Sequence, residues 1–305
     1  MEWQQIVGFC QIARLGSFTR AASATFRTQS ALSQQIKALE VELECELLER
    51  IGRRKIQLTP AGERFLTFAS TLLDHHDQLI GELNELKGQQ IGRLRMAAQF
   101  APLYYLLPEV VEKYIRDFPQ VELTILERSP MGVIELVKSG EIDFGIAVEG
   151  IVPKDLATIR LKSAESVLVA PVGHPLTKVK RITLRHMAQY PLILGPSNLK
   201  HTFREKLERR FEALGIHYRI IMESPNIALS ARYVEAGLGI SVVAMGFGLK
   251  RSKHGKLAFI PIDNLFNPDH IAVVMRKDKV LQPYKSAFIN LLFGGNMPQN
   301  SLSQR

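Results

Sequence analysis

Residues 28–43, TQSALSQQIKALEVEL, decide how the first part of this chain folds. As a helix, the stretch has one apolar stripe at spacings of four, three and four, formed by Leu32, Ile36, Leu39 and Leu43. A second face carries short polar side chains and a lysine: Ser30, Ser33, Gln34 and Lys37. Hydroxyls, amides and a lysine can reach base edges and phosphates in the major groove of DNA. The stretch therefore predicts a helix that packs on one side and contacts DNA with the other.

Two further helices are predicted before this one, over residues 3–14 and 18–24. The first has apolar residues at three-and-four spacing and ends at Gly16. Ser17 and Thr28 are residues of the kind that cap helix N-termini, so they mark the starts of the second and third helices. Helix, short helix, turn and polar-faced helix together predict a helix-turn-helix.

A basic hairpin is predicted next, in residues 45–62, CELLERIGRRKIQLTPAG. Apolar and basic residues alternate on both sides of Gly52, which indicates two strands joined by a turn at residues 51–53. Cations cluster at the tip: Arg50, Arg53, Arg54 and Lys55. Such a wing can hold phosphates beside the groove that the helix enters. A solvated charge run is the alternative, and the adjacent helix-turn-helix favours the wing.

Three motifs carry a family resemblance: LGSFTRAASATF at residues 15–26, TQSALSQQIKALEVELECELLER at 28–50, and RRKIQLTPAGERFL at 53–66. In order and spacing they resemble the N-terminal winged helix-turn-helix of LysR-type transcriptional regulators. The predicted DNA-binding residues are Thr28, Gln29, Ser30, Ser33, Gln34, Lys37, Arg53, Arg54 and Lys55. The family commonly has a basic residue directly after the serine that corresponds to Ser33. This chain has Gln34 there, so its base preference does not follow from the family pattern.

The net charge of +9 lies in the later part of the chain. Residues 1–90 carry ten Lys and Arg against eleven Asp and Glu, whereas residues 91–305 carry 29 against 19. Bulk charge therefore does not support DNA binding, and that prediction depends on the local arrangement of side chains. Many of the later cations alternate with glutamates on a predicted helix over residues 199–214, which is typical of an exposed helix face. The alternative is that they attract an anionic effector or flanking DNA.

The sequence also indicates where the protein works. The N-terminus lacks the pattern of a secretory signal, and no apolar run approaches the roughly 20 residues that span a bilayer. We therefore predict a soluble, cytoplasmic protein without a membrane partner. The two cysteines, Cys10 and Cys45, lie far apart without metal-ligand spacing. We expect both to be buried thiols, with neither a disulfide nor a metal site.

A long helix is predicted over residues 60–87, with an apolar residue at every seventh position: Phe65, Leu72, Leu79 and Leu86. A seven-residue repeat of this kind is buried best against another helix of the same kind. The pattern resembles the linker helix that pairs two subunits in the LysR-type family. These four residues are therefore the predicted dimerisation residues of a homodimer or homotetramer. Residues 88–92 then indicate a hinge.

The rest of the chain alternates strand and helix patterns, as expected for an α/β sheet. These patterns include one helix over residues 103–118 and an apolar run over residues 167–171. Residues 118–148, FPQVELTILERSPMGVIELVKSGEIDFGIAV, resemble the first effector subdomain of the family. The predicted fold class is thus α/β, with an N-terminal winged helix-turn-helix, a long linker helix and a two-subdomain effector domain like periplasmic solute-binding proteins. The predicted domains are residues 1–59, 60–91 and 92–295, the last divided into subdomain I (92–162 and 267–295) and subdomain II (163–266).

Ligands of open α/β sheets bind beyond the carboxyl ends of the strands, and the family binds its effectors in that cleft. The predicted effector-binding residues are Ala98, Gln99, Phe100, Ala101, Ser129, Met131, Val148, Glu149, Pro196, Ser197, Asn198, Thr202 and Asn226. Several relatives that bind small oxyanions or carboxylates use a serine or threonine pair after the first strand, where this chain has Ala98, Gln99 and Ala101. A pure sulfate-like ligand is therefore disfavoured, and Phe100 and Met131 indicate room for an apolar part.

We predict a sequence-specific DNA-binding regulator whose promoter binding responds to a carboxylate or other anion with an apolar part. Its expected partners are double-stranded promoter DNA, the effector, a second copy of the chain and, as a further candidate, RNA polymerase; no cofactor is expected. The alternative is a small-molecule-binding protein or enzyme whose α/β domain acts without DNA. The sequence lacks GxSxG, GxxxxGK[ST] and HExxH motifs, which disfavours an enzyme.

Overall fold

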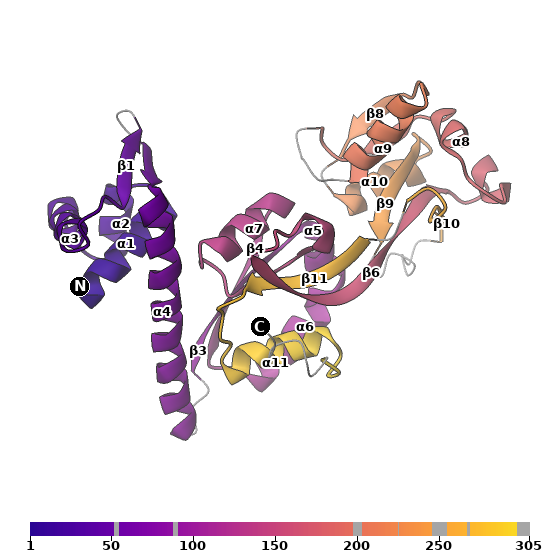
Figure 1. Ribbon diagram of the computed structural model, residues 1–305. Helices are drawn as coiled ribbons and strands as arrows, with labels where there is room; N and C mark the ends of the chain where they lie inside the picture. The colour runs from indigo at the N-terminus through magenta and orange to yellow at the C-terminus, as the bar shows by residue number, and fades with distance from the viewer. Residues whose placement is uncertain are drawn as a thin grey trace.

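Three parts follow one another along the chain (Figure 1). An N-terminal helical module with a two-stranded wing leads into one long helix, α4, and this into an α/β domain made of two subdomains. The structure is a computed structural model that describes residues 1–51, 55–87, 91–197, 203–224, 226–245, 255–266 and 269–297.

The N-terminal module is built on three helices: α1 (Trp3–Leu15), α2 (Phe18–Ala24) and α3 (Gln29–Glu42). The predicted caps are present, because Ser17 Oγ accepts a hydrogen bond from the Arg20 N–H and Thr28 Oγ1 accepts one from the Ala31 N–H. Gly16 ends α1 in the left-handed conformation, at φ 59°. The helices therefore begin and end close to where the sequence predicts.

The apolar stripe of α3 packs into the core of this module. Leu32, Ile36 and Leu39 are fully or almost fully buried. Gly8 lets α1 approach closely, since a Cβ built there would lie 2.6 Å from Leu32 Cδ1. The prediction that Leu43 belongs to the stripe is wrong, because α3 ends at Glu42 and the side chain of Leu43 turns outward, leaving the residue 37% exposed.

The wing and the long helix follow α3. The wing pairs β1 (Leu48–Ile51) with β2 (Lys55–Leu58) in antiparallel register, and the predicted turn lies outside the described residues. The long helix is α4 (Pro60–Leu86). Its first turns pack on the module, with the Phe65 ring edge-on to Phe9 at a centroid distance of 4.9 Å. The wing and α4 thus share one core with the three helices.

The α/β domain has one continuous sheet in the order β4-β3-β5-β11-β6-β9-β7-β8, and β10 pairs with β6. Subdomain I contains β3 (Gly92–Ala98), α5 (Phe100–Tyr105), α6 (Leu107–Asp117), β4 (Val121–Glu127), α7 (Pro130–Lys138), β5 (Phe144–Val148), η1 (Glu149–Ile151), β11 (Asp269–Arg276) and α11 (Pro283–Leu292). Subdomain II contains η2 (Pro175–Lys178), α8 (Leu184–Ala188), β7 (Leu192–Leu194), α9 (Phe203–Ala213), β8 (Ile220–Glu223), α10 (Ile227–Glu235), β9 (Ile240–Met245) and β10 (Leu257–Pro261).

One strand, β6 (Leu156–Pro171), belongs to both subdomains. Its first half pairs with β11 as far as Ala164, and its second half pairs with β9 from Glu165 onward. The pairing partner therefore changes two residues after the boundary at residues 162 and 163 that we predicted. Because this strand runs through without a break, it forms one of the two connections between the subdomains (Figure 1).

The sequence analysis missed or misjudged several elements. It predicted one helix over residues 103–118, but α5 and α6 are separate helices. Pro108 lacks the N–H that a continuous helix would use to bond the Tyr104 carbonyl. The sequence analysis predicted only the end of the long strand β6, and it missed β10. These strands are recognisable only through their partners far along the chain.

Both cysteines are free, but they differ in environment. Burial raises the pKa of the Cys10 thiol to about 12. Cys45 is exposed, so the expectation of two buried thiols is wrong for this residue, which follows the end of α3. Within the described residues, no group of His, Cys, Asp and Glu is arranged to hold a metal ion, and no helix has the length and apolar character needed to cross a membrane.

Candidate functional site

Helix α3 lies at the outer edge of the N-terminal module (Figure 1), and its polar face is open to solvent. Ser33 on this face is half-buried, and the other predicted DNA-binding residues of the helix and its cap are exposed: Thr28, Gln29, Ser30, Gln34 and Lys37. Thr28 Oγ1 and Ser30 Oγ lie 3.1 Å apart, and Gln29 Oε1 accepts a hydrogen bond from Thr19 Oγ1 at 3.2 Å. The helix therefore presents hydroxyls, amides and one cation together, as base-edge recognition requires.

Glu40 attaches the wing to this helix. One oxygen of its carboxylate, Oε1, accepts hydrogen bonds from the N–H groups of Leu47 and Leu48, at 2.8 and 3.1 Å. The single acid near the polar face thus binds the backbone at the base of the wing. Of the predicted phosphate-binding residues, Arg53 and Arg54 lie outside the described residues, as does the side chain of Lys55, whose backbone lies in β2.

Phe26 is a surface feature that the sequence analysis missed. It lies in the turn between α2 and α3, two residues before the cap Thr28, and it is 98% exposed. Its φ of 55° places a non-glycine residue in the left-handed region, which directs the ring away from the helices. Only its position in the helix-turn-helix turn could have indicated that it lies beside the polar face of α3.

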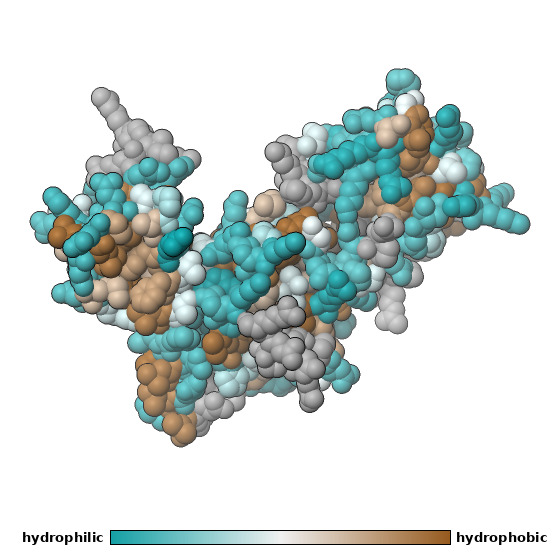
Figure 2. Space-filling model, in the orientation of Figure 1, coloured by the Kyte–Doolittle hydropathy of each residue, from teal (hydrophilic) through white to brown (hydrophobic). Residues whose placement is uncertain are grey.

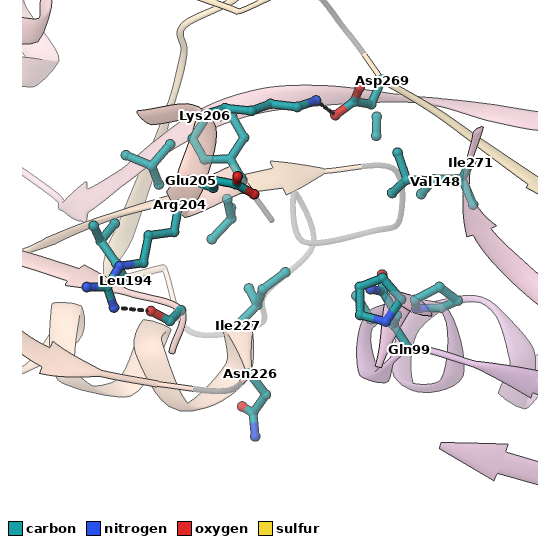
Figure 3. Close-up of a pocket in the computed structure, with 18 of the residues that line it drawn as sticks. Gln99, Val148, Leu194, Arg204, Glu205, Lys206, Asn226, Ile227, Asp269 and Ile271 are labelled. Atoms are coloured by element: carbon teal, nitrogen blue, oxygen red, sulfur yellow. Dashed lines mark hydrogen bonds and ion pairs between the residues drawn. The ribbon is translucent and has the colours of Figure 1, made fainter. Parts of the chain in front are cut away.

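A cavity of about 370 Å³ lies between the two subdomains (Figure 3). Subdomain I contributes mainly apolar groups with one amide and one carboxylate, among them Gln99, Pro102, Tyr105, Asp269 and Ile271. Subdomain II contributes a mixture of apolar, polar, cationic and acidic groups, among them Leu194, Arg204, Glu205, Lys206, Asn226 and Ile227. A cavity of this size with a mostly apolar wall and a few polar groups is typical of a small-molecule site.

The structure brings four of the predicted effector-binding residues to this cavity: Gln99, Ala101, Val148 and Asn226. The other described ones do not line it, namely Ala98, Phe100, Ser129, Met131, Glu149, Pro196 and Ser197. Phe100 stacks on Tyr104 with ring centroids 5.2 Å apart, and Ser129 caps α7. Glu149 pairs with Arg160 at 2.6 Å. Asn198 and Thr202 lie outside the described residues.

Lys206 joins the two walls of the cavity. Its Nζ on α9 lies 2.6 Å from Asp269 Oδ2 at the start of β11, so the ion pair spans the subdomains (Figure 3). Both partners line the cavity. Neither was predicted as a site residue, because α9 is charged along its length and the strand-end rule selects loops rather than helix side chains.

Arg204 is a second cation at the cavity, and its side chain is only 9% exposed. It donates hydrogen bonds to Glu208, to Glu223 and to the Gly195 carbonyl, at 2.8, 2.6 and 2.6 Å. Burial lowers its pKa, but the two carboxylates raise it by more, so the pKa lies above its usual value. The interpretation of α9 as an exposed charged face is therefore wrong for Arg204, and it fits Arg209, which is largely exposed and pairs with Glu205.

Three serines line the cavity with their hydroxyl protons already engaged. Ser224 and Ser230 both donate to the main-chain carbonyl of Asn226, at 2.9 and 3.2 Å, and Ser241 donates to that of Ile193, at 2.7 Å. A hydroxyl that donates to the protein presents lone pairs to a ligand. These serines therefore suit hydrogen-bond donors of a ligand better than its anionic oxygens.

Two protein-family models match parts of this chain. Residues 3–63 match the family model described as "Bacterial regulatory helix-turn-helix protein, lysR family", and residues 87–294 match "LysR substrate binding domain". Among curated proteins, the HTH-type transcriptional regulator CysB of Burkholderia cenocepacia is 31% identical over 278 residues, which are 90% of this chain and 88% of that protein.

Solved structures show the same fold. A full-length OxyR variant from Pseudomonas aeruginosa superposes with a TM-score of 0.71 at 23% identity, covering 97% of this chain and 94% of that one. Full-length CbnR complexed with its target DNA superposes with a TM-score of 0.54 at 22% identity, covering 97% and 100%.

The class of protein is therefore a DNA-binding transcriptional regulator with an effector-binding domain. The chain belongs to the LysR family. The family and the fold class that the sequence predicted are confirmed.

Proposed function

We propose that this regulator binds promoter DNA as a homodimer or homotetramer, with α3 in the major groove. We further propose that a small anion with an apolar part, bound in the cavity, changes that binding. The observation that supports the effector class most directly is the cavity itself, where Lys206 of α9 reaches across to Asp269 of subdomain I and the rest of that subdomain's wall is mainly apolar. For regulation to follow, the effector must bind one arrangement of the subdomains more tightly than another.

The anionic part of the effector is assigned to Lys206. This ammonium group is already held between the subdomains by Asp269, so an anion that enters the cavity competes with that carboxylate for the same cation. The apolar part is assigned to the opposite wall, where Pro102, Tyr105 and Ile271 line the cavity. Burial of apolar ligand surface there contributes roughly 25 cal/mol per Å².

We assign the contact between paired subunits to the far half of α4. Apolar residues are exposed along it: Leu79, Ile80, Leu83 and Leu86. Figure 2 shows a brown patch over the free end of this helix. Of the four heptad residues predicted for dimerisation, Phe65 packs in the core of its own N-terminal module, and Leu72 is half-buried against that core. We therefore propose Leu79 and Leu86 with Leu83 as the dimer contact.

A thermal-shift screen of the full-length protein tests the effector class. Small carboxylates, oxyanions and aromatic acids are compared with their neutral amides, because a ligand of the native state raises the melting temperature. We expect acids to raise it and Lys206→Met to weaken their apparent affinity about tenfold, as loss of one charge-assisted contact does. Lys178→Met, at an exposed lysine outside the cavity, is the control. Equal shifts by the neutral amides would refute the anionic effector.

A further inference from the structure

Six charged side chains meet where α4 crosses the end of β11, at a place that neither the DNA surface nor the cavity uses. Three are acids and three are bases: Asp74, Asp143, Asp278, Arg276, Lys279 and Lys285. Four of the six side chains are less than 10% exposed, with Lys279 at 5%. Charged groups are rarely buried to this extent unless they are paired.

The bonds in this cluster join α4 to subdomain I. Asp74, halfway along α4, accepts hydrogen bonds from Arg276 Nη2 and Lys279 Nζ, both at 2.6 Å. Thr71, one turn earlier on α4, donates to Asp278. Through Lys279, whose Nζ also lies 2.9 Å from Asp143 Oδ1, the contact continues into the interior of subdomain I.

Asp143 anchors the inner side of the cluster. It is bound by Lys285 Nζ at 2.8 Å and by the Arg95 N–H at 2.8 Å, both within subdomain I. Burial raises its pKa, but Lys279 and Lys285 lower it by more, so the carboxylate has a pKa below its usual value. Asp143 therefore holds Lys279 in place for Asp74.

A second contact joins the same two parts nearby. Arg14, at the end of α1, pairs with Glu141 of subdomain I at 3.1 Å. The turn before Glu141 fits closely against the cluster, because a Cβ at Gly140 would lie 2.4 Å from Arg276 Nη1 and 3.2 Å from Ser70 Oγ. The two contacts, one on α4 and one on α1, fix the orientation of the N-terminal module relative to subdomain I, whereas a single contact would allow rotation about it.

The balance of charges indicates what the cluster does. Three acids against three bases leave no net charge to attract an ion, so a ligand site is disfavoured. Buried ion pairs contribute little net stability compared with apolar packing, but a wrongly placed partner leaves a buried charge unpaired. Such a cluster therefore discriminates strongly between alternative orientations of the two parts it joins.

One strand connects this cluster with the cavity. β11 begins at Asp269, which pairs with Lys206 across the cavity, and ends at Arg276, which pairs with Asp74 of α4. It lies between β5 and β6 in the sheet and is bonded to both. Figure 1 shows it running from the junction of the subdomains to the side of α4.

We propose that Asp74, Arg276 and Lys279 are positioning residues that lock the DNA-binding module to subdomain I, and that β11 links this lock to the effector cavity. The link rests on the proposed function, in which the cavity controls DNA binding. The lock itself is a property of the free chain and can be tested without DNA or effector.

Spin-label distances in the full-length protein test the lock. One label is placed on the exposed Cys45 and the second on Gln120→Cys in subdomain I, and every sample carries Cys10→Ala because that thiol is only half-buried. Dilution with unlabelled protein restricts the signal to one chain. We expect one narrow distance distribution in the wild type and at least a twofold broader one in Asp74→Asn and Lys279→Met.

Two matched variants separate positioning from general damage. Lys285→Met removes a partner of Asp143 from within subdomain I and leaves both contacts to Asp74, so its distribution is expected to stay narrow. Lys279→Arg keeps the charge and is expected to restore the narrow distribution. A broad distribution in the wild type, or a narrow one in Asp74→Asn, would overturn the lock.

DNA geometry tests the link to function. DNA is first selected from a random pool by the wild-type protein. We expect Asp74→Asn to bind a single half-site as tightly as the wild type, but to bind the full site about tenfold more weakly with a changed bend angle. An unchanged bend and full-site affinity would overturn the proposal. Failure of the wild type to select any DNA would refute the proposed function instead, and the spin-label result would still decide the lock.

Discussion

The polar face of α3 and the cavity between the subdomains are the two proposed recognition surfaces, and they are assembled differently. The face of α3 comes from six residues within positions 28–37, whereas the cavity draws on residues from Gln99 to Ile271. The first surface is set by the period of one helix, and the second exists only once two subdomains are placed against each other. A surface of the first kind can be altered residue by residue, while one of the second kind also depends on whatever positions the subdomains.

The two surfaces also differ in how their cations are held. Lys37 on α3 is exposed and forms no ion pair with the described residues, so it is ready for a phosphate. In the cavity, Lys206 is paired with Asp269, and Arg204 with Glu208 and Glu223. An anion that binds either of these cations must therefore displace a carboxylate of the protein. Under the proposed function, Lys37 is therefore open to any phosphate, whereas the cavity admits only an anion that can displace a carboxylate.

The largest effect is expected where DNA binding depends on a second subunit. Leu79→Asp combined with Leu83→Asp places two charges on the exposed apolar face of α4. We expect the assembly to fall apart and DNA affinity to drop by more than about 100-fold, because linked half-site binding is lost. Sedimentation velocity and DNA titration measure this. Leu229→Asp, at a comparably exposed leucine on α10, is the control, and an intact assembly in the double variant would exclude α4 as the dimer contact.

The next effect concerns the DNA-binding module alone. Glu40→Ala removes the carboxylate that accepts from the N–H groups of Leu47 and Leu48. We expect the module to lose about 2 kcal/mol of unfolding free energy, because two partly buried donors are left unpaired. Urea unfolding measures the loss. Glu42→Ala, at an exposed carboxylate that pairs with the N-terminus, should cost under about 0.5 kcal/mol, and equal losses would remove Glu40 from the wing's support.

The sequence predicted the elements that carry the first surface better than the residues that line the second, for a physical reason. Helix period, caps and the basic hairpin are local signals, and they placed α1, α2 and α3 within a residue of their ends. The rule of strand ends found Gln99, Val148 and Asn226 at the cavity. It could not find Lys206 or Asp269, because their pairing joins residues 63 positions apart on elements that the rule does not select.

A smaller effect is expected from the base-reading residues of α3. Ser33→Ala with Gln34→Ala removes one hydroxyl and one amide from the polar face. We expect preference for the selected site over random DNA to fall about tenfold, while binding to random DNA is retained, since one good base contact is worth roughly 1–3 kcal/mol. Competition titrations with both DNAs measure the ratio. An equal loss on both would show that these side chains support affinity rather than specificity.

The smallest expected effect is the pH dependence of the charged cluster between α4 and subdomain I. The pKa of Asp143 lies below its usual value of 3.8, because Lys279 and Lys285 outweigh the cost of burial. This carboxylate therefore contributes stability that is fully present above pH 3.8 and is lost as pH falls through its depressed pKa. The pKa of Lys279 lies above 10.5, because Asp143 and Asp74 outweigh burial, so its contribution is present below pH 10.5 and lost at higher pH.

A comparison of the wild type with Asp143→Asn isolates the contribution of Asp143 to the unfolding free energy. The other carboxylates titrate in both proteins, so their effects cancel in the difference. Asp74 on α4, together with Arg276 and Asp278 at the end of β11, belongs to the same cluster and is unchanged in the variant. We expect the difference in unfolding free energy to be constant around neutral pH and to shrink below pH 3.8. A difference that does not change with acid would mean that Asp143 is not bound as a carboxylate, and then Lys279 would depend on Asp74 alone.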